Sequence, residues 1–170
     1  MTAYVALLRA VNVGGRQLKM ADLKAAAEKL GLDSPRTFIA SGNLLFVSKK
    51  GEATVKRALE TALTEHMGKR VEVMVRTAQE MEDAVAANPF AEEPGSKVVA
   101  IFFDDPQPDN AISSAKNVAD ERLALGTREI YVHYPSGQGR SKLRLSGRAQ
   151  GTARNMNTVA KLAELAREMA

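Results

Sequence analysis

The order of strand-like and helix-like segments in the first half of the chain constrains its fold more than any other feature. Four short runs are apolar or alternate between apolar and polar residues, as strands do: 2–10, 36–40, 43–48 and 70–76. Two longer segments have apolar residues at helical spacing: 20–31 and 52–67. Their order, β-α-β-β-α-β, is the ferredoxin-like pattern, in which two helices cover one face of an antiparallel sheet. We therefore predict an α+β protein with a ferredoxin-like subdomain over residues 1–76.

The side chains that these helices bury can be predicted from their spacing. The longer helix is expected to bury apolar residues at four-residue steps: Val55, Leu59, Leu63 and Met67. The shorter helix is expected to end at Gly31 and to bury one face: Leu23, Ala26, Ala27 and Leu30. The tripeptide Ser41-Gly42-Asn43 separates two strand-like runs, which predicts a tight hairpin.

Residues 77–170 are expected to form a second α+β subdomain, packed with the first as one compact unit. A helix that ends before Pro89 is followed by a buried strand over 96–105 and a helix over 108–119. Residues 121–125 and 128–134 then predict a second hairpin, and a Gly-rich bend leads to a closing helix from about Thr152 to Met169. This β-α-β-β-α outline also fits a divergent ferredoxin-like half.

Composition narrows the class of protein and the kinds of site. The chain has no cysteine, which excludes disulfides, thiolate metal sites and a cysteine nucleophile. No run approaches the roughly 18 apolar residues of a membrane-spanning helix, and the N-terminal residues lack the basic region of a signal peptide. We expect a cytoplasmic protein that does not engage a membrane.

Positive charge is concentrated near the C-terminus. The segment from Gln138 to Ala163 has no acidic residue and six basic ones: Arg140, Lys142, Arg144, Arg148, Arg154 and Lys161. The whole chain has a net charge of only +4, so the remainder is slightly acidic. Such a local positive field suits phosphate, nucleic acid or an acidic partner, and it also suits a merely solvated basic face.

The first candidate site follows the first strand. In the predicted topology, the loop after that strand and the turn between the second and third strands lie at one end of the sheet. This end would gather a set of polar and glycine residues: Asn12, Gly14, Gly15, Arg16, Ser41, Gly42 and Asn43. Paired glycines can direct N–H groups at an anion, and the following helix adds its positive end. Alternatively, the glycines only provide the left-handed backbone of a turn.

The second candidate site is the start of the closing helix. Thr152 is the predicted N-cap, since its hydroxyl can accept from free N–H groups of the first turn. Arg154, Thr158 and Lys161 follow at helical spacing and would flank that positive end, which suits a phosphate or carboxylate. The alternative is an exposed face with capping by Thr152 and Asn155.

Five short motifs, in this order, resemble the bacterial domain-of-unknown-function family 1697: LLRAVNVGG, SGNLLF, NPF, GRSKL and TARNMNTVAKLAEL. The opening motif of that family usually reads RGINVGG; here Ala10 and Val11 replace the Gly and Ile, while Arg9, Asn12, Gly14 and Gly15 are kept. The resemblance implies a compact α+β protein with a ferredoxin-like part. It implies no activity or cofactor, and it marks the two candidate sites, including Asn155, as family signatures.

No recognisable catalytic constellation is present in the sequence. The only histidines, His66 and His133, do not suggest a ligand pair, and Asp104-Asp105 is more simply part of a turn than a Mg²⁺ site. We expect neither a metal nor a cofactor, and the oligomeric state stays open. The preferred hypothesis is a binding module for an anionic small molecule, a nucleotide or phosphorylated metabolite. The alternatives are non-specific nucleic-acid binding through the basic segment and a non-catalytic protein-interaction module.

Overall fold

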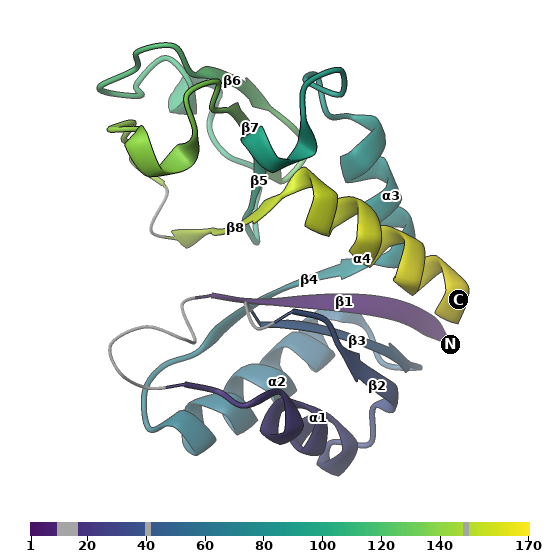
Figure 1. Ribbon diagram of the computed structural model, residues 1–170. Coiled ribbons are helices and arrows are strands. Elements are labelled where there is room, and N and C mark those ends of the chain that lie inside the picture. Colours follow the sequence, from purple (N-terminus) through teal and green to yellow (C-terminus); the bar gives the residue numbers. More distant parts are fainter. Residues whose placement is uncertain (10–16, 40–41, 148–149) are drawn as a thin grey trace. The chain divides into compact units, whose positions relative to one another are not determined.

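The computed structural model describes residues 1–9, 17–39, 42–147 and 150–170 (Figure 1). It is an α+β structure with two antiparallel four-stranded sheets and four α-helices in these residues. Internal contacts divide the chain into two units. The first contains residues 1–81 and 162–170, and the second contains residues 82–161. No helix in the described part of the chain is long and apolar enough to cross a membrane.

The sheet of the first unit has the strand order β2-β3-β1-β4. Its strands are β1 (Thr2–Arg9), β2 (Asp33–Thr37), β3 (Asn43–Ser48) and β4 (Glu72–Thr77). Two helices connect them: α1 (Met20–Lys29) between β1 and β2, and α2 (Glu52–Met67) between β3 and β4. The predicted order of elements is therefore present. The prediction for the second strand was wrong by three residues, because pairing with β3 starts at Asp33 and continues through a bulge to Thr37.

The core of the first unit lies between one face of this sheet and the two helices. Tyr4, Ala6 and Leu8 of β1 contribute alternate side chains to it. The intervening residues of the same strand, Ala3, Val5 and Leu7, are buried as well. All four residues predicted for the buried face of α2 are buried, and Leu23 and Ala27 of α1 join them. Gly31 and Gly68 have left-handed backbones after the two helices, where a side chain would be strained.

The sheet of the second unit has the order β6-β7-β5-β8, which repeats the arrangement of the first sheet. The strands are β5 (Val98–Phe102), β6 (Arg122–Leu125), β7 (Glu129–His133) and β8 (Thr152–Asn155). Helix α3 (Ala78–Ala86) precedes β5, and helix α4 (Met156–Met169) follows β8. The predicted hairpin is confirmed as β6 and β7, which pair antiparallel.

The predicted helix over 108–119 was wrong. Only the 3₁₀ turn Asp109–Ala111 forms there. The Ser113 and Ser114 hydroxyls donate to the carbonyls of Asn110 and Ala111, so polar side chains compete for the backbone. Lys116 pairs through its backbone with Arg144, and Asn117 has φ 59°, which ends any helical course.

The predicted start of the closing helix was also wrong. Thr152–Asn155 is strand β8, whose register pairs Thr152 with Phe102 and Arg154 with Ala100. Just before this strand, a Cβ on Gly151 would lie 2.9 Å from the Phe102 carbonyl oxygen, so the chain approaches β5 closely at a glycine. Helix α4 begins at Met156, where the Asn155 Oδ1 accepts from the Thr158 N–H (3.0 Å) and caps it.

Candidate functional site

Most residues of the first candidate site, the predicted anion site after the first strand, are not among those that the structure describes. Asn12, Gly14, Gly15, Arg16 and Ser41 lie outside the described residues. Arg9, at the end of β1, forms an ion pair with Glu72, whose Oε2 lies 3.3 Å from the Arg9 Nε. The anion site proposed around this loop therefore stays a prediction.

Gly42 and Asn43 hold the hairpin between β2 and β3. The fully buried Asn43 amide donates from Nδ2 to the Phe38 carbonyl (2.9 Å), and the Phe38 N–H donates to the Asn43 carbonyl (3.1 Å). Gly42 has φ 84°, and its carbonyl accepts from the Leu8 N–H of β1 (2.9 Å). These contacts give both signature residues a role in the fold.

The structure does not bring Arg154 together with Thr158 and Lys161 on one helix face. Arg154 is a buried residue of β8, and its Nη1 donates to the Thr152 Oγ1 (2.6 Å) and the Ala153 carbonyl (2.9 Å). Burial lowers the pKa of its guanidinium to about 10. Thr158 and Lys161 belong to α4, where Asn155 satisfies the Thr158 N–H. The predicted anion site at this helix start is therefore not assembled as the spacing suggested.

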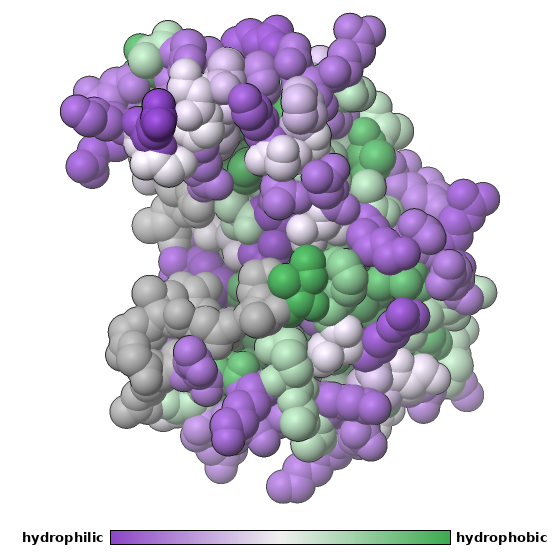
Figure 2. All heavy atoms as spheres, in the orientation of Figure 1, coloured by the Kyte–Doolittle hydropathy of each residue, from purple (hydrophilic) through white to green (hydrophobic). Residues whose placement is uncertain are grey.

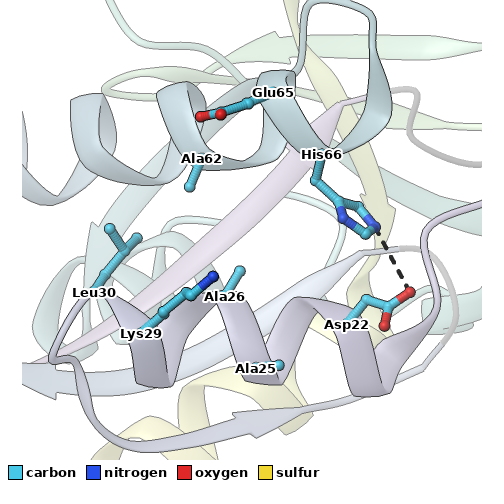
Figure 3. A pocket seen from close by; sticks show the side chains of 8 residues that line it. All are labelled: Asp22, Ala25, Ala26, Lys29, Leu30, Ala62, Glu65 and His66. Atoms are coloured by element: carbon cyan, nitrogen blue, oxygen red, sulfur yellow. Dashed lines mark ion pairs between the residues drawn. The ribbon is translucent and has the colours of Figure 1, made fainter.

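A groove of about 630 Å³ lies between α1 and α2 in the first unit (Figure 3). Ala25, Ala26 and Ala62 line it with small apolar side chains. At one end, the His66 Nε2 lies 3.6 Å from the Asp22 Oδ2, and the two side chains form an ion pair between the helices when His66 is protonated. Both side chains of the pair are about half exposed (48% and 45%), and such pairs contribute little to stability.

A second pocket, of about 780 Å³, lies in the second unit between the loops 117–121 and 134–142. It is lined by carboxylates, hydroxyls and cations. These groups are Asp120, Glu121, Ser136, Arg140, Ser141 and Lys142.

Hydrogen bonds fix the two carboxylates of this pocket. The Glu121 Oε1 accepts from the Ala119 N–H (2.7 Å), and its Oε2 accepts from the Ser141 hydroxyl, which in turn accepts from the Leu143 N–H (3.1 Å). The Ser141 bond and the backbone N–H groups lower the pKa of Glu121, which is therefore ionised at neutral pH. Asp120 accepts a bond of 2.5 Å from the Ser136 hydroxyl. Both loops are thus held in place around the pocket.

The two cations of the pocket have a different environment. Arg140 and Lys142 are exposed, and neither forms an ion pair with any residue that the structure describes. Gly137, with φ 88°, turns the loop that presents Arg140. The pocket therefore combines two cations that form no ion pair within the described residues with two carboxylates that already accept hydrogen bonds.

Sequence reasoning identified GRSKL as a signature but gave it no role. The bond between Ser141 and Glu121 joins residues twenty positions apart, and no periodicity or spacing in the sequence indicates it. Arg140 and Lys142 were visible only as part of the general positive charge.

A third polar cluster surrounds His133. Arg122 donates from Nη2 to the His133 Nδ1 (3.0 Å) and lies 3.2 Å from Glu93 Oε1, while the His133 Nε2 lies 3.6 Å from Glu93 Oε2. The proton of a neutral His133 is therefore on Nε2, facing Glu93. Phe90 packs against both the His133 ring and the Arg122 guanidinium. Because His133 is only 5% exposed, the cluster connects Glu93, Arg122 and His133 to one another and is not open to a ligand.

With the geometry established, comparison with known proteins assigns the family. Residues 1–131 match the family described as "Protein of unknown function (DUF1697)". The chain belongs to the DUF1697 family. No match was found among curated proteins. Among solved structures, the chain is similar to the conserved bacterial protein SP0830 from Streptococcus pneumoniae, at 23% identity and a TM-score of 0.83. The match covers 98% of this chain and 99% of that one, and at this identity it shows a shared fold.

Proposed function

We propose that this DUF1697 protein is a binding module for a small anionic molecule, held in the pocket between the loops 117–121 and 134–142. The observation that carries the proposal is that Arg140 and Lys142 line this pocket without an ion pair among the described residues. A guanidinium and an ammonium together suit a phosphate or carboxylate group. The volume of about 780 Å³ is in the range that small-molecule sites occupy.

The carboxylates of the pocket keep their negative charge and have hydrogen-bond donors of their own in the two loops. Both Glu121 oxygens accept hydrogen bonds, and Asp120 accepts one from Ser136. Their charge is therefore stabilised by the loops themselves, and their role in this proposal is to hold the pocket open. This location replaces the start of α4 as the preferred site, because Arg154 is buried in β8.

The experiment is a thermal-shift titration of the whole chain with inorganic phosphate, nucleotides and sugar phosphates. A ligand at about ten times its dissociation constant adds about 1.4 kcal/mol, which raises the melting temperature by roughly 3–5 °C. We expect Arg140→Ala with Lys142→Ala to abolish this shift. Lys49→Ala with Lys50→Ala removes two exposed cations of the first unit and is the matched control.

Two further outcomes separate this pocket from the other hypotheses. If Arg16→Ala abolishes the shift and the Arg140 and Lys142 changes do not, the ligand binds at the loop after β1. If no anion shifts the melting temperature of the wild type, small-anion binding is wrong. The contacts of Asn43 and Asn155 then favour a protein-interaction module whose signature residues serve the fold.

We also assign a ferredoxin-like fold to the first unit. The strand order β2-β3-β1-β4 supports this assignment, as do the α1 and α2 connections and the core shared by both helices and one sheet face. The second sheet has the same order of strands, but among the described residues its connections corresponding to α1 and α2 contain short 3₁₀ turns and no α-helix.

A further inference from the structure

A short two-stranded ribbon in the second unit places like charges opposite each other. Lys116 and Arg144 exchange two backbone hydrogen bonds, each 2.9 Å long, although they are far apart in sequence. Residues that exchange both bonds of an antiparallel bridge face each other directly, so their side chains leave the ribbon on the same side. Both residues are exposed.

A third cation extends this arrangement along the chain. From Ser141 to Ser146, intermediate or buried residues alternate with exposed ones, as in an extended segment with one face inward. Leu143 and Leu145 pack in the second core, so Lys142 and Arg144 lie on the outer face, roughly 7 Å apart along the chain. We call Lys116, Lys142 and Arg144 the basic strip.

No acidic group offsets the charge of the basic strip. None of its three residues forms an ion pair within the residues that the structure describes, and no Asp or Glu occurs between Ile130 and Ala163. In the space-filling view, many hydrophilic side chains lie on the visible face of the second unit (Figure 2). Like charges opposite each other on a ribbon repel, and this repulsion is relieved when an anion binds across them.

We propose that the basic strip binds the phosphate backbone of nucleic acids without reading the bases. Its cations lie next to one another on an exposed surface, which suits a polymer with one charge per repeat. The strip has no aromatic residue for base stacking and no Asn or Gln for base edges, so contacts to phosphates dominate. The strip shares Lys142 with the small-anion pocket, whereas Lys116 and Arg144 do not line that pocket, so changes at these two positions test the strip alone.

The test is a fluorescence titration of the full chain with a labelled single-stranded oligonucleotide of mixed sequence. Three phosphate contacts predict that affinity falls roughly 20-fold between 50 and 200 mM salt. Lys116→Ala with Arg144→Ala leaves one contact, so the fall is expected to be only about threefold. Lys116→Arg with Arg144→Lys keeps both charges and is expected to retain the wild-type salt dependence.

The titration is repeated with a duplex of the same sequence and, separately, with polyglutamate. The Lys49→Ala, Lys50→Ala double variant loses the same number of charges and is the control. Binding of either nucleic acid that depends on Lys116 and Arg144, but not on the control positions, supports the proposal. Absence of binding at 50 mM salt overturns it, as does equal affinity for polyglutamate or an unchanged alanine double variant. The small-anion thermal shift is expected to survive the Lys116 and Arg144 changes, so the two proposals fail separately.

Discussion

Glu121 is a buried carboxylate whose lowered pKa has one hydroxyl as its largest cause. The bond from Ser141 is the largest cause of its lowered pKa, ahead of the Ala119 N–H. Because the folded-state pKa is below the unfolded one, this interaction stabilises the protein above about pH 4.5. That stability is lost as the pH falls through the folded-state pKa. Changing Ser141→Ala is expected to raise the Glu121 pKa toward its ordinary value, as carboxyl-carbon NMR titration measures.

Ser141→Ala is also expected to reduce how strongly the stability of the folded protein depends on pH below about pH 4.5. Thermal melts between pH 3 and pH 7 measure this effect. Ser136→Ala is the matched control, since it removes a serine–carboxylate bond at Asp120 and leaves Glu121 intact. An unchanged Glu121 titration in the Ser141 variant would contradict the assignment.

Tyr131 is a second residue whose polar side-chain atom forms a hydrogen bond inside the protein. Its hydroxyl donates to the Ala84 carbonyl of α3 (2.5 Å), and burial, with the nearby Glu129 charge, raises its pKa well above the ordinary value. Tyr131→Phe keeps the packing but leaves the carbonyl without this donor. We expect a loss of about 1–3 kcal/mol in the free energy of unfolding, measured by urea denaturation. A loss below 0.5 kcal/mol, the lower end for a single hydrogen bond, would show that water replaces the hydroxyl.

At the scale of elements, the start of α4 depends on Asn155. Its Oδ1 caps the helix at the Thr158 N–H, while Thr152 is part of β8. Asn155→Ala is expected to reduce the free energy of unfolding by about 1 kcal/mol, and Asn155→Asp is expected to retain most of it. Denaturant melts of the three proteins test this. A smaller effect than that of Thr152→Val, which removes the hydroxyl, would return the capping role to Thr152.

Elements with a strong internal pattern were predictable from sequence, and those stabilised by distant partners were not. Helix α2 has its four buried residues at regular steps, and its bounds match the prediction. Strand β8 is only four residues long and continues directly into α4, so helical spacing extends through it in the sequence. Its strand conformation comes from pairing with β5, which residues 152–155 alone do not reveal.

The candidate sites, too, were only partly predictable from the sequence. The sequence identified Asn43 and Asn155 as signature residues, but their hydrogen bonds to Phe38 and Thr158 are visible only in the fold. Arg154 was assigned to a helix face by spacing, and its strand position overturns that role. No pattern in the sequence singles out Lys116, since its pairing with Arg144 depends on a long loop.

At the scale of the whole molecule, the end of the chain returns to the unit that contains its start. Residues 162–170 group with residues 1–81, although the first turns of α4 belong to the second unit. Leu162, Leu165 and Ala166 are buried in this segment. Burial of two leucines contributes roughly 3–6 kcal/mol, which is a large share of the stability of a domain. The first unit is therefore expected to depend on the last residues of the chain.

Leu165→Ala tests this dependence. We expect it to lower the free energy of unfolding by about 2–5 kcal/mol, because Leu165 is only 4% exposed. Native-state hydrogen exchange should then show the greater loss of amide protection in β1 and β3 of the first sheet, and a smaller loss in β5 and β7. Glu164→Ala, at an exposed neighbouring position, is the control. Equal loss of amide protection in both sheets would mean that the two units unfold together as one cooperative structure. The prediction that the first unit depends more strongly on Leu165 would then be wrong.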